Sequence, residues 1–182
     1  MRTPTTSNTT RGFAIFEIML ALVIGVFLAT TAMVVFGTTI GSGRVMQAQA
    51  WISQTADKTK QSYSSSPDFM TVTQASAVTD GLFPAASMTG TGNTPVNPWG
   101  GDFTVTAFDI NEGPSMAIGV IMDQVPTADC IKLAAVMTAT STVFIGGTQI
   151  ARDGVAPNMQ AVSTMCDNGD GGARMQFDYA KR

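Results

Sequence analysis

The chain has 182 residues, enough for one ordinary domain or for a small domain with an appendage. Hydrophobic residues make up 45%, near the globular average, so the chain as a whole is neither disordered nor a polytopic membrane protein. Charged residues make up only 13%, and the net charge of -3 argues against a nucleic-acid-binding protein. The absence of histidine excludes Ser-His-Asp catalysis, Cys-His catalysis and His-ligated metals.

A long apolar segment lies near the N-terminus. Residues 18–40 carry no charge, and as a helix they would be about 35 Å long, enough to cross a bilayer core. Arg2 and Arg11 precede this segment, and positive charge on that side favours an N-terminus that stays in the cytoplasm. We therefore expect a transmembrane helix at 18–40, with the rest of the chain facing outward.

Two ordinary interpretations of this segment leave something unexplained. A secretory signal peptide would have a shorter apolar core followed by a small-x-small cleavage site, and neither feature is present here. A plain single-span anchor explains the length, but it leaves the carboxylate of Glu17 at the start of the apolar segment without a partner.

Residues 11–17, with the sequence RGFAIFE, carry a more specific signal. A basic residue, a glycine, an apolar residue, and a glutamate five positions after the glycine lead into a long apolar helix. This pattern resembles the type III signal of type IV pilins and pseudopilins. The resemblance implies a cytoplasmic leader at 1–12, which a prepilin peptidase removes between Gly12 and Phe13 before it methylates the new N-terminus at Phe13.

The resemblance also gives Glu17 a role in assembly. In this family the glutamate neutralises the N-terminal amine of a neighbouring subunit, which here would be the amine of Phe13. A lone carboxylate is costly in a low-dielectric setting, whereas a carboxylate paired with an ammonium is much less so. We therefore expect Glu17 to set the stagger between subunits of a filament.

The helix is expected to continue beyond the membrane as an amphipathic half, giving one long helix over 13–66. Its predicted buried face follows steps of three and four residues and consists of Val45, Ala48, Ile52, Ala56, Thr59 and Tyr63. A separate short helix after a break at Gly41 and Gly43 is the alternative. Pro67 disfavours helical geometry at Ser66 and ends the helix. We expect a head that begins near Ala50 to fold alone.

Local patterns predict an α+β head over residues 67–182. Residues 103–108 alternate between apolar and polar as a half-buried strand does, and a turn at 111–114 returns the chain as a second strand at 116–122. The other predicted elements are a short helix at 68–78, a loop at 89–97, a helix capped by Thr127 or Asp129 and ending near Met137, a helix from Pro157 to Cys166, and strands at 142–145, 149–152 and 174–179.

Three further stretches resemble type IVb pilins: GLFP at 81–84, NPWGG at 97–101, and VPTADCIKL at 125–133. The resemblance implies the pilin fold, an αβ-roll in which the long N-terminal helix packs on the antiparallel sheet of the head. Trp99, between a proline and a glycine, is expected to anchor the junction of loop and strand in the core.

Cys130 and Cys166 are the only cysteines. In an exported domain such a pair is best explained as a disulfide, and a loop of about 36 residues would contribute about 3.8 kcal/mol in the chain-entropy model. Two unpaired buried cysteines are the alternative, while a redox pair would have C-x-x-C spacing. By resemblance to pilins, the disulfide bounds an outward-facing region at 130–166.

The Asp- and Gly-rich residues 167–172 suggest a calcium loop, but Gly169 and Gly171 occupy positions where an EF-hand has oxygen ligands, so a turn is favoured. We therefore expect no metal, no cofactor and no catalytic residue.

The resemblance implies a structural protein and not an enzyme. It implies the major subunit of a type IVb pilus, or fimbrium, that serves adhesion, aggregation or conjugative contact. The prepilin would wait in the inner membrane with its head in the periplasm, and an assembly platform would polymerise it into a helical homo-oligomer outside the cell. The expected partners are the peptidase, the platform and other copies, without nucleic acid. A minor pilin or type II secretion pseudopilin is the alternative, and a membrane-anchored periplasmic binding protein is a more remote one.

Overall fold

The computed structural model describes residues 18–20, 22–23, 43–89, 94–110, 113–152, 154–167 and 172–180. The chain separates into two units, Met1–Gly41 and Ser42–Arg182. In the first unit, residues 18–20 and 22–23 are helical and exposed, and the rest of the predicted transmembrane segment lies outside the described residues. No helix within the described ranges is both long enough and apolar enough to span a bilayer.

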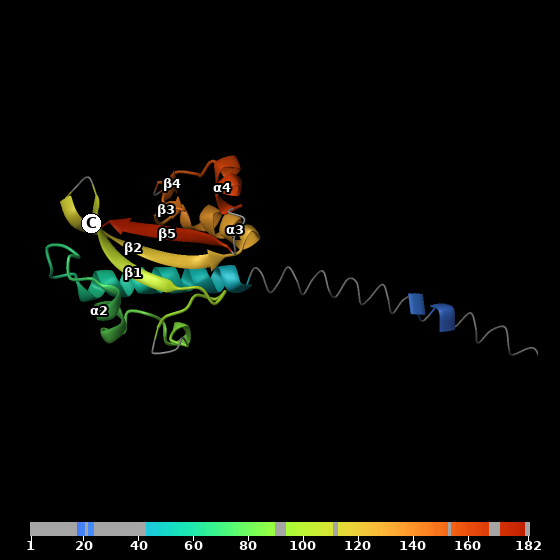
Figure 1. The fold of residues 1–182 in the computed structure, drawn as a ribbon, viewed down its shortest axis with the longest axis horizontal. Coiled ribbons are helices and arrows are strands. Elements are labelled where there is room, and N and C mark those ends of the chain that lie inside the picture. Colours follow the sequence, from blue (N-terminus) through green and yellow to red (C-terminus); the bar gives the residue numbers. More distant parts are fainter. Residues whose placement is uncertain are drawn as a thin grey trace, which may run out of the picture. The chain divides into compact units, whose positions relative to one another are not determined.

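The second unit is an α+β head built on one antiparallel sheet (Figure 1). A helix covers residues 43–62. It is followed by α2 (Gln74–Thr79), the 3-10 helix η1 (Ala85–Ser87), β1 (Phe103–Ile110), β2 (Gly113–Val125), α3 (Thr127–Met137), β3 (Thr142–Ile145), β4 (Thr148–Ala151), α4 (Met159–Cys166) and β5 (Ala173–Ala180). The strand order is β1-β2-β5-β3-β4, so the last strand lies between the β1–β2 hairpin and β3.

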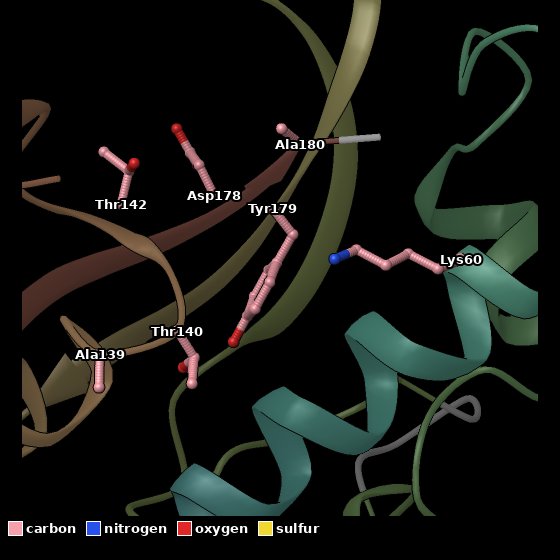
Figure 2. Close-up of a pocket in the computed structure, with 7 residues that line it drawn as sticks. All are labelled: Lys60, Ala139, Thr140, Thr142, Asp178, Tyr179 and Ala180. Atoms are coloured by element: carbon pink, nitrogen blue, oxygen red, sulfur yellow. The ribbon is translucent and has the colours of Figure 1, made fainter. Parts of the chain in front are cut away.

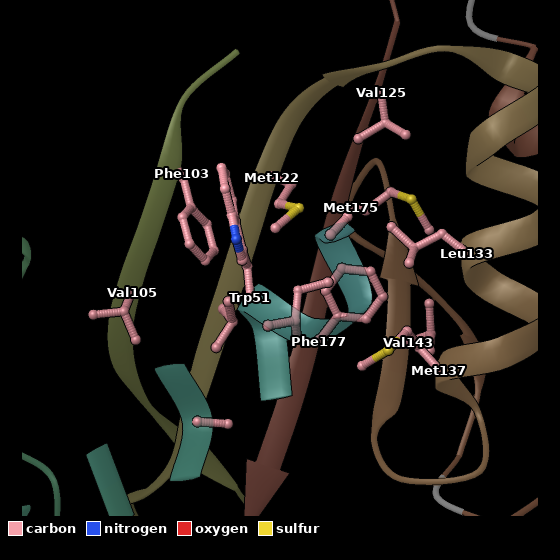
Figure 3. Close-up of a cluster of buried hydrophobic side chains, with 14 of the residues drawn as sticks. Trp51, Phe103, Val105, Met122, Val125, Leu133, Met137, Val143, Met175 and Phe177 are labelled. Carbon is pink, nitrogen blue, oxygen red and sulfur yellow. The ribbon is translucent and has the colours of Figure 1, made fainter. Parts of the chain in front are cut away.

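Strand register places the large apolar side chains on one face of this sheet. Two rows of paired residues cross four strands, Val105–Val120–Phe177–Val143 and Phe103–Met122–Met175–Ile145. All eight side chains are buried. The 43–62 helix covers this face through Trp51, and α3 covers it through Leu133 and Met137 (Figure 3). The 43–62 helix, α3 and the sheet enclose one hydrophobic core.

The 43–62 helix buries the face that its sequence predicts. Val45, Ala48, Ile52, Ala56 and Thr59 are all buried. Burial of these residues follows from their helical spacing, which lines them up along one side. Val45 and Ala48 belong to the core, so a head beginning near Ala50 would lack two buried side chains that one beginning at Ser42 keeps.

Trp51 adds an aromatic contact from the same helix. Its ring stacks on Phe103 with 6.3 Å between centroids, and Phe83 meets Phe103 edge-on at 5.1 Å. The helix ends at residue 62, four residues before Ser66, and turns follow up to the predicted stop at Pro67. Whether this helix continues the predicted one from Phe13 lies outside the described residues.

The structure confirms most predicted strands and helices of the head. Some helices begin later than predicted, because side-chain capping sets the residue at which they start. The helix predicted at 68–78 begins only at Gln74, because Thr73 and Ser76 form a capping box there. The helix predicted from Pro157 begins at Met159, because the Asn158 side chain accepts hydrogen bonds from the first free N–H groups. Proline offers no such acceptor.

The predicted cap of α3 is also wrong. Its N-cap is Pro126, without a side-chain hydrogen bond. Thr127 Oγ1 instead donates to the Cys166 carbonyl at 3.2 Å. The Asp129 carboxylate accepts from the indole of Trp99. Both predicted capping residues therefore serve tertiary contacts.

Strand β2 changes direction at its end, where the register with β5 shifts between Met122 and Val125. Gln124 has a φ of 58°, which is unusual for a residue with a side chain. Its neighbourhood is crowded, because Gly101 and Gly172 approach the backbone of residues 123–124 too closely for either to carry a Cβ. This bulge leads the chain out of the sheet into α3.

Candidate functional site

The predicted processing and assembly residues, Gly12, Phe13 and Glu17, lie outside the described residues. Their roles therefore remain predictions. The head offers three features that bear on function: the disulfide-bounded region, the loop that supports it, and a polar pocket at the sheet edge.

Cys130 and Cys166 form a disulfide. It joins α3 to α4 across 36 residues, with 5.9 Å between the two Cα atoms, and both residues are fully buried. This confirms the predicted pairing and excludes the alternative of two free thiols. The hydrogen bond from Thr127 to the Cys166 carbonyl holds the same two helices together beside it.

The disulfide-bounded region 130–166 comprises most of α3, the β3–β4 hairpin and α4, which lie together at one end of the head (Figure 1). Its inner side chains belong to the core, among them Leu133, Met137 and Val162. Several apolar side chains stay exposed on its surface, namely Val136, Val155, Met159 and Met165.

The loop before β1 is built around the buried side chain of Asn97. Its Oδ1 accepts hydrogen bonds from the backbone N–H groups of Trp99 (2.9 Å) and Gly101 (3.1 Å). Its Nδ2 donates to the carbonyl of Asp123 at the β2 bulge. One amide therefore closes the loop and fixes it to the sheet.

Trp99 connects this loop to the disulfide-bounded region. Its indole Nε1 donates to Asp129 Oδ2 at 2.9 Å, and its half-buried ring packs against the core. The prediction that Trp99 anchors the junction is confirmed, but its polar contact was not foreseen. Lys132 approaches the same carboxylate at 3.9 Å.

A pocket of about 320 Å³ lies where β5 runs past the start of β3 (Figure 2). Its lining residues are Lys60, Ala139, Thr140, Thr142, Asp178, Tyr179 and Ala180. Asp178 and Tyr179 leave β5 on opposite sides, and the Lys60 ammonium points toward the Tyr179 ring, 5.1 Å from its centroid. The lining is polar and carries both signs of charge.

Asp178 is buried on the sheet face that the helices leave uncovered. Register places it between Gly119 and Thr142, and the Phe108 ring occupies the space above Gly119. This burial raises the pKa of Asp178 to about 7, against the smaller opposing effect of the hydrogen bond from Gln176. A carboxyl group in this position changes charge near neutral pH.

Tyr179 lies on the core side of the same strand. Burial raises the pKa of its phenol to about 12. The hydroxyl has no hydrogen bond of good geometry, although Ser141, Thr140 and Ser53 are close enough to oppose this rise. The tyrosine therefore stays neutral and acts as a packing residue under Lys60.

Within the described ranges, no three Cys, Asp or Glu side chains gather as metal ligands would. Sequence analysis missed Asn97 and Asp178, whose roles depend on partners far along the chain. An isolated asparagine before a Pro-Trp-Gly-Gly turn was the one local signal for the first. No local sequence signal indicates the role of Asp178.

Comparisons with known proteins agree with this architecture. The PilS family model, described as PilS N terminal, matches residues 43–177, more than half of the chain. The head is also similar to the crystal structure of a type IV b pilin from Salmonella typhi, with a TM-score of 0.51 and 23% identity over 70% of this chain and 94% of that one.

A second similar structure is TcpA, a type IV pilin from Vibrio cholerae El Tor. Its TM-score is 0.53, with 14% identity over 76% of this chain and 99% of that one. At these identities the two structures establish the fold alone. No curated protein matches the chain. The family match over residues 43–177 shows that the chain belongs to the PilS family of type IV pilins, which are structural subunits and not enzymes.

Proposed function

We propose that this pilin is the major subunit of a type IVb pilus. It is made as an inner-membrane prepilin, loses residues 1–12 to a prepilin peptidase, is methylated at Phe13, and is polymerised by the assembly platform into a surface filament. The filament serves adhesion, aggregation or conjugative contact.

One observation carries this proposal. The 43–62 helix buries one face in a pilin head, and the sequence before it is the uncharged segment 18–40, preceded by the Gly12–Glu17 signal. An apolar N-terminal segment, followed by a helix that packs into the head, suits a subunit that moves from a bilayer into a filament.

Glu17 favours a polymerising subunit over one that caps a tip. Once Gly12 is cut from Phe13, the new amine and the Glu17 carboxylate of a neighbouring copy neutralise each other in the apolar filament centre. The Cys130–Cys166 disulfide favours a pilin over a pseudopilin, in which a calcium site often takes its place.

Mass spectrometry of sheared surface filaments tests the processing step. We expect a chain that begins at methylated Phe13. An intact leader, or cleavage near residue 30, in cells that contain the peptidase would refute the proposal.

The assembly role of Glu17 is tested separately with Glu17→Val. Cleavage and membrane insertion should be unchanged, while filament yield should fall sharply, because the Phe13 amine loses its partner. The chain has only one other glutamate, Glu112 in the head, so Glu112→Val is a matched control that should assemble normally. Equal filament yields from both variants would contradict the pairing.

A further inference from the structure

Strand β1 is an edge strand, and its free side is partly occupied by a side chain. Even-numbered residues face β2; for example, Asp102 O accepts from Asp123 N at 3.1 Å. The backbone groups of Phe103, Val105 and Ala107 therefore point away from the sheet. A row of such unpaired groups is a template on which a strand from another chain can pair.

The amide of Gln74 fills the centre of this row. Its Nε2 donates to Phe103 O at 3.2 Å, and its Oε1 accepts from Val105 N at 2.9 Å. The N–H and C=O of one residue in a parallel neighbouring strand would bond the same two groups, so the side-chain amide takes the place of one residue of such a strand. The preceding group along the edge, Phe103 N–H, donates to Pro95 O at 3.2 Å.

The position of Gln74 is fixed from both sides. It is the first residue of α2 and lies between Thr73 and Ser76, the two residues that form the capping box. The segment before it is held by Phe69 and Val72, and the helix behind it by Ala77, all of which are buried. The amide is therefore presented to the edge by a rigid support, and α2 lies beside β1 (Figure 1).

The two edge strands of the sheet differ in length. Strand β4, at the opposite edge, has only four residues, from Thr148 to Ala151. Strand β1 has eight, and an edge of that length needs protection where copies of a protein are concentrated. No other described group bonds Val105 O or the Ala107 N–H. The outward backbone groups up to Val105 N–H are therefore hydrogen-bonded, and those from Val105 O onward are open.

We propose that the Gln74 side chain is an edge cap, which occupies strand-pairing groups of β1 and prevents two copies of the head from joining along this edge. The inference does not depend on which kind of pilus the subunit builds. Removal of the cap leaves four consecutive outward groups, from Phe103 O to Ala107 N–H, free to pair with β1 of a second copy in an antiparallel, two-fold arrangement.

The first test compares Gln74→Ala with the wild type as full-length chains in neutral detergent. Hydrogen exchange at the Val105 amide should become faster by about tenfold, the loss of one buried hydrogen bond. Sedimentation should show a dimer that grows with concentration, while the wild type stays monomeric. Gln160→Ala, at an exposed position of α4, is the matched control and should behave as the wild type.

A second-site variant separates edge pairing from general loosening of the head. Thr106 is exposed on β1, and lysine on an edge strand opposes pairing. Thr106→Lys added to Gln74→Ala should restore the monomer while exchange at Val105 stays fast. A double variant that still dimerises would show that association runs through another surface, and it would overturn the proposal.

Gln74→Glu tests the two hydrogen bonds individually. The carboxylate accepts from Val105 N–H but cannot donate to Phe103 O, whereas the protonated acid, present near about pH 4, can do both. The bond to Val105 N–H is kept and a charge at an edge opposes pairing, so Gln74→Glu should stay monomeric at neutral pH with slow exchange at Val105, unlike Gln74→Ala. Gln74→Ala that remains monomeric, or slow exchange at Val105 in that variant, would also refute the edge cap.

Discussion

The indole of Trp99 donates to the carboxylate of Asp129 across 30 residues of sequence, with 2.9 Å between Nε1 and Oδ2. The bond joins the loop that opens β1 to the first turn of α3. An acid in the first turn of a helix is also favoured by the helix dipole. The start of the disulfide-bounded region is thereby tied to the sheet.

Trp99→Phe keeps most of the ring but removes this donor. We expect the free energy of unfolding to fall by about 1.5–3 kcal/mol, the usual contribution of a hydrogen bond to a charged group. Urea denaturation measures the change. Lys132→Met is the control: its ammonium is exposed and lies 3.9 Å from the same carboxylate, so its loss should cost under about 1 kcal/mol. Equal losses in both variants would contradict the assignment.

Asp178 makes the head sensitive to pH. Its folded-state pKa of about 7 lies above the ordinary 3.8, so between these values the folded chain holds a proton that the unfolded chain has released. Stability from this group is complete below about pH 4 and is lost as the pH rises through about 7.

Asp178→Asn should therefore remove the fall in stability between about pH 4 and 8, and the variant should be more stable than the wild type at the upper end. Thermal melting over this range measures both effects. Asp102→Asn, at an exposed position before β1, should leave the wild-type slope intact. A stability difference between Asp178→Asn and the wild type that stays constant over the same range would show that Asp178 is charged in the fold.

Local periodicity was enough to predict much of this head. Val45, Ala48 and Ile52 recur at helical spacing, and Phe103 and Val105 alternate with polar residues, so their burial follows from the sequence. Periodicity does not name the partner of a side chain. The hydrogen bonds of Gln74 to β1 join segments far apart in sequence, and the position of Asp178 opposite Gly119 depends on strand register.

Helix starts were less predictable for a related reason. Several residues near a helix start can cap it, and tertiary contacts decide among them. Thr127 and Asp129 both suit an N-cap, yet one bonds the Cys166 carbonyl and the other bonds Trp99. Asn158 caps α4, so this helix begins at Met159, two residues after the expected start at Pro157.

The head should be separable from the N-terminal segment at Ser42 and not at Ala50. A chain beginning at Ser42 keeps Val45 and Ala48, which are 6% and 0% exposed, whereas one beginning at Ala50 lacks both. Loss of these buried side chains removes apolar contacts worth several kcal/mol, at about 25 cal/mol per Å². After export to an oxidising compartment, the longer chain should be monomeric and melt cooperatively, and the shorter one should aggregate. Equal melting of the two would place the first helical turn outside the core.

The Cys130–Cys166 disulfide should account for a large part of the stability of the head. Its loop of about 36 residues corresponds to about 3.8 kcal/mol, compared with about 5–15 kcal/mol for a whole domain. Cys130→Ser and Cys166→Ser should each lower the amount of pilin in cells, because proteases reach the loosened region between α3 and α4.

The double variant should be no worse than either single one, since both changes remove the same bond. In the proposed pathway the leader is removed on the cytoplasmic side before the bond forms, so cleavage after Gly12 should be unaffected in all three. Immunoblots of pilin abundance and N-terminal mass spectrometry separate these effects. Alkylation of purified filaments gives the decisive control: free thiols at both positions would mean that the α3–α4 connection is made by packing and by the Thr127 hydrogen bond alone.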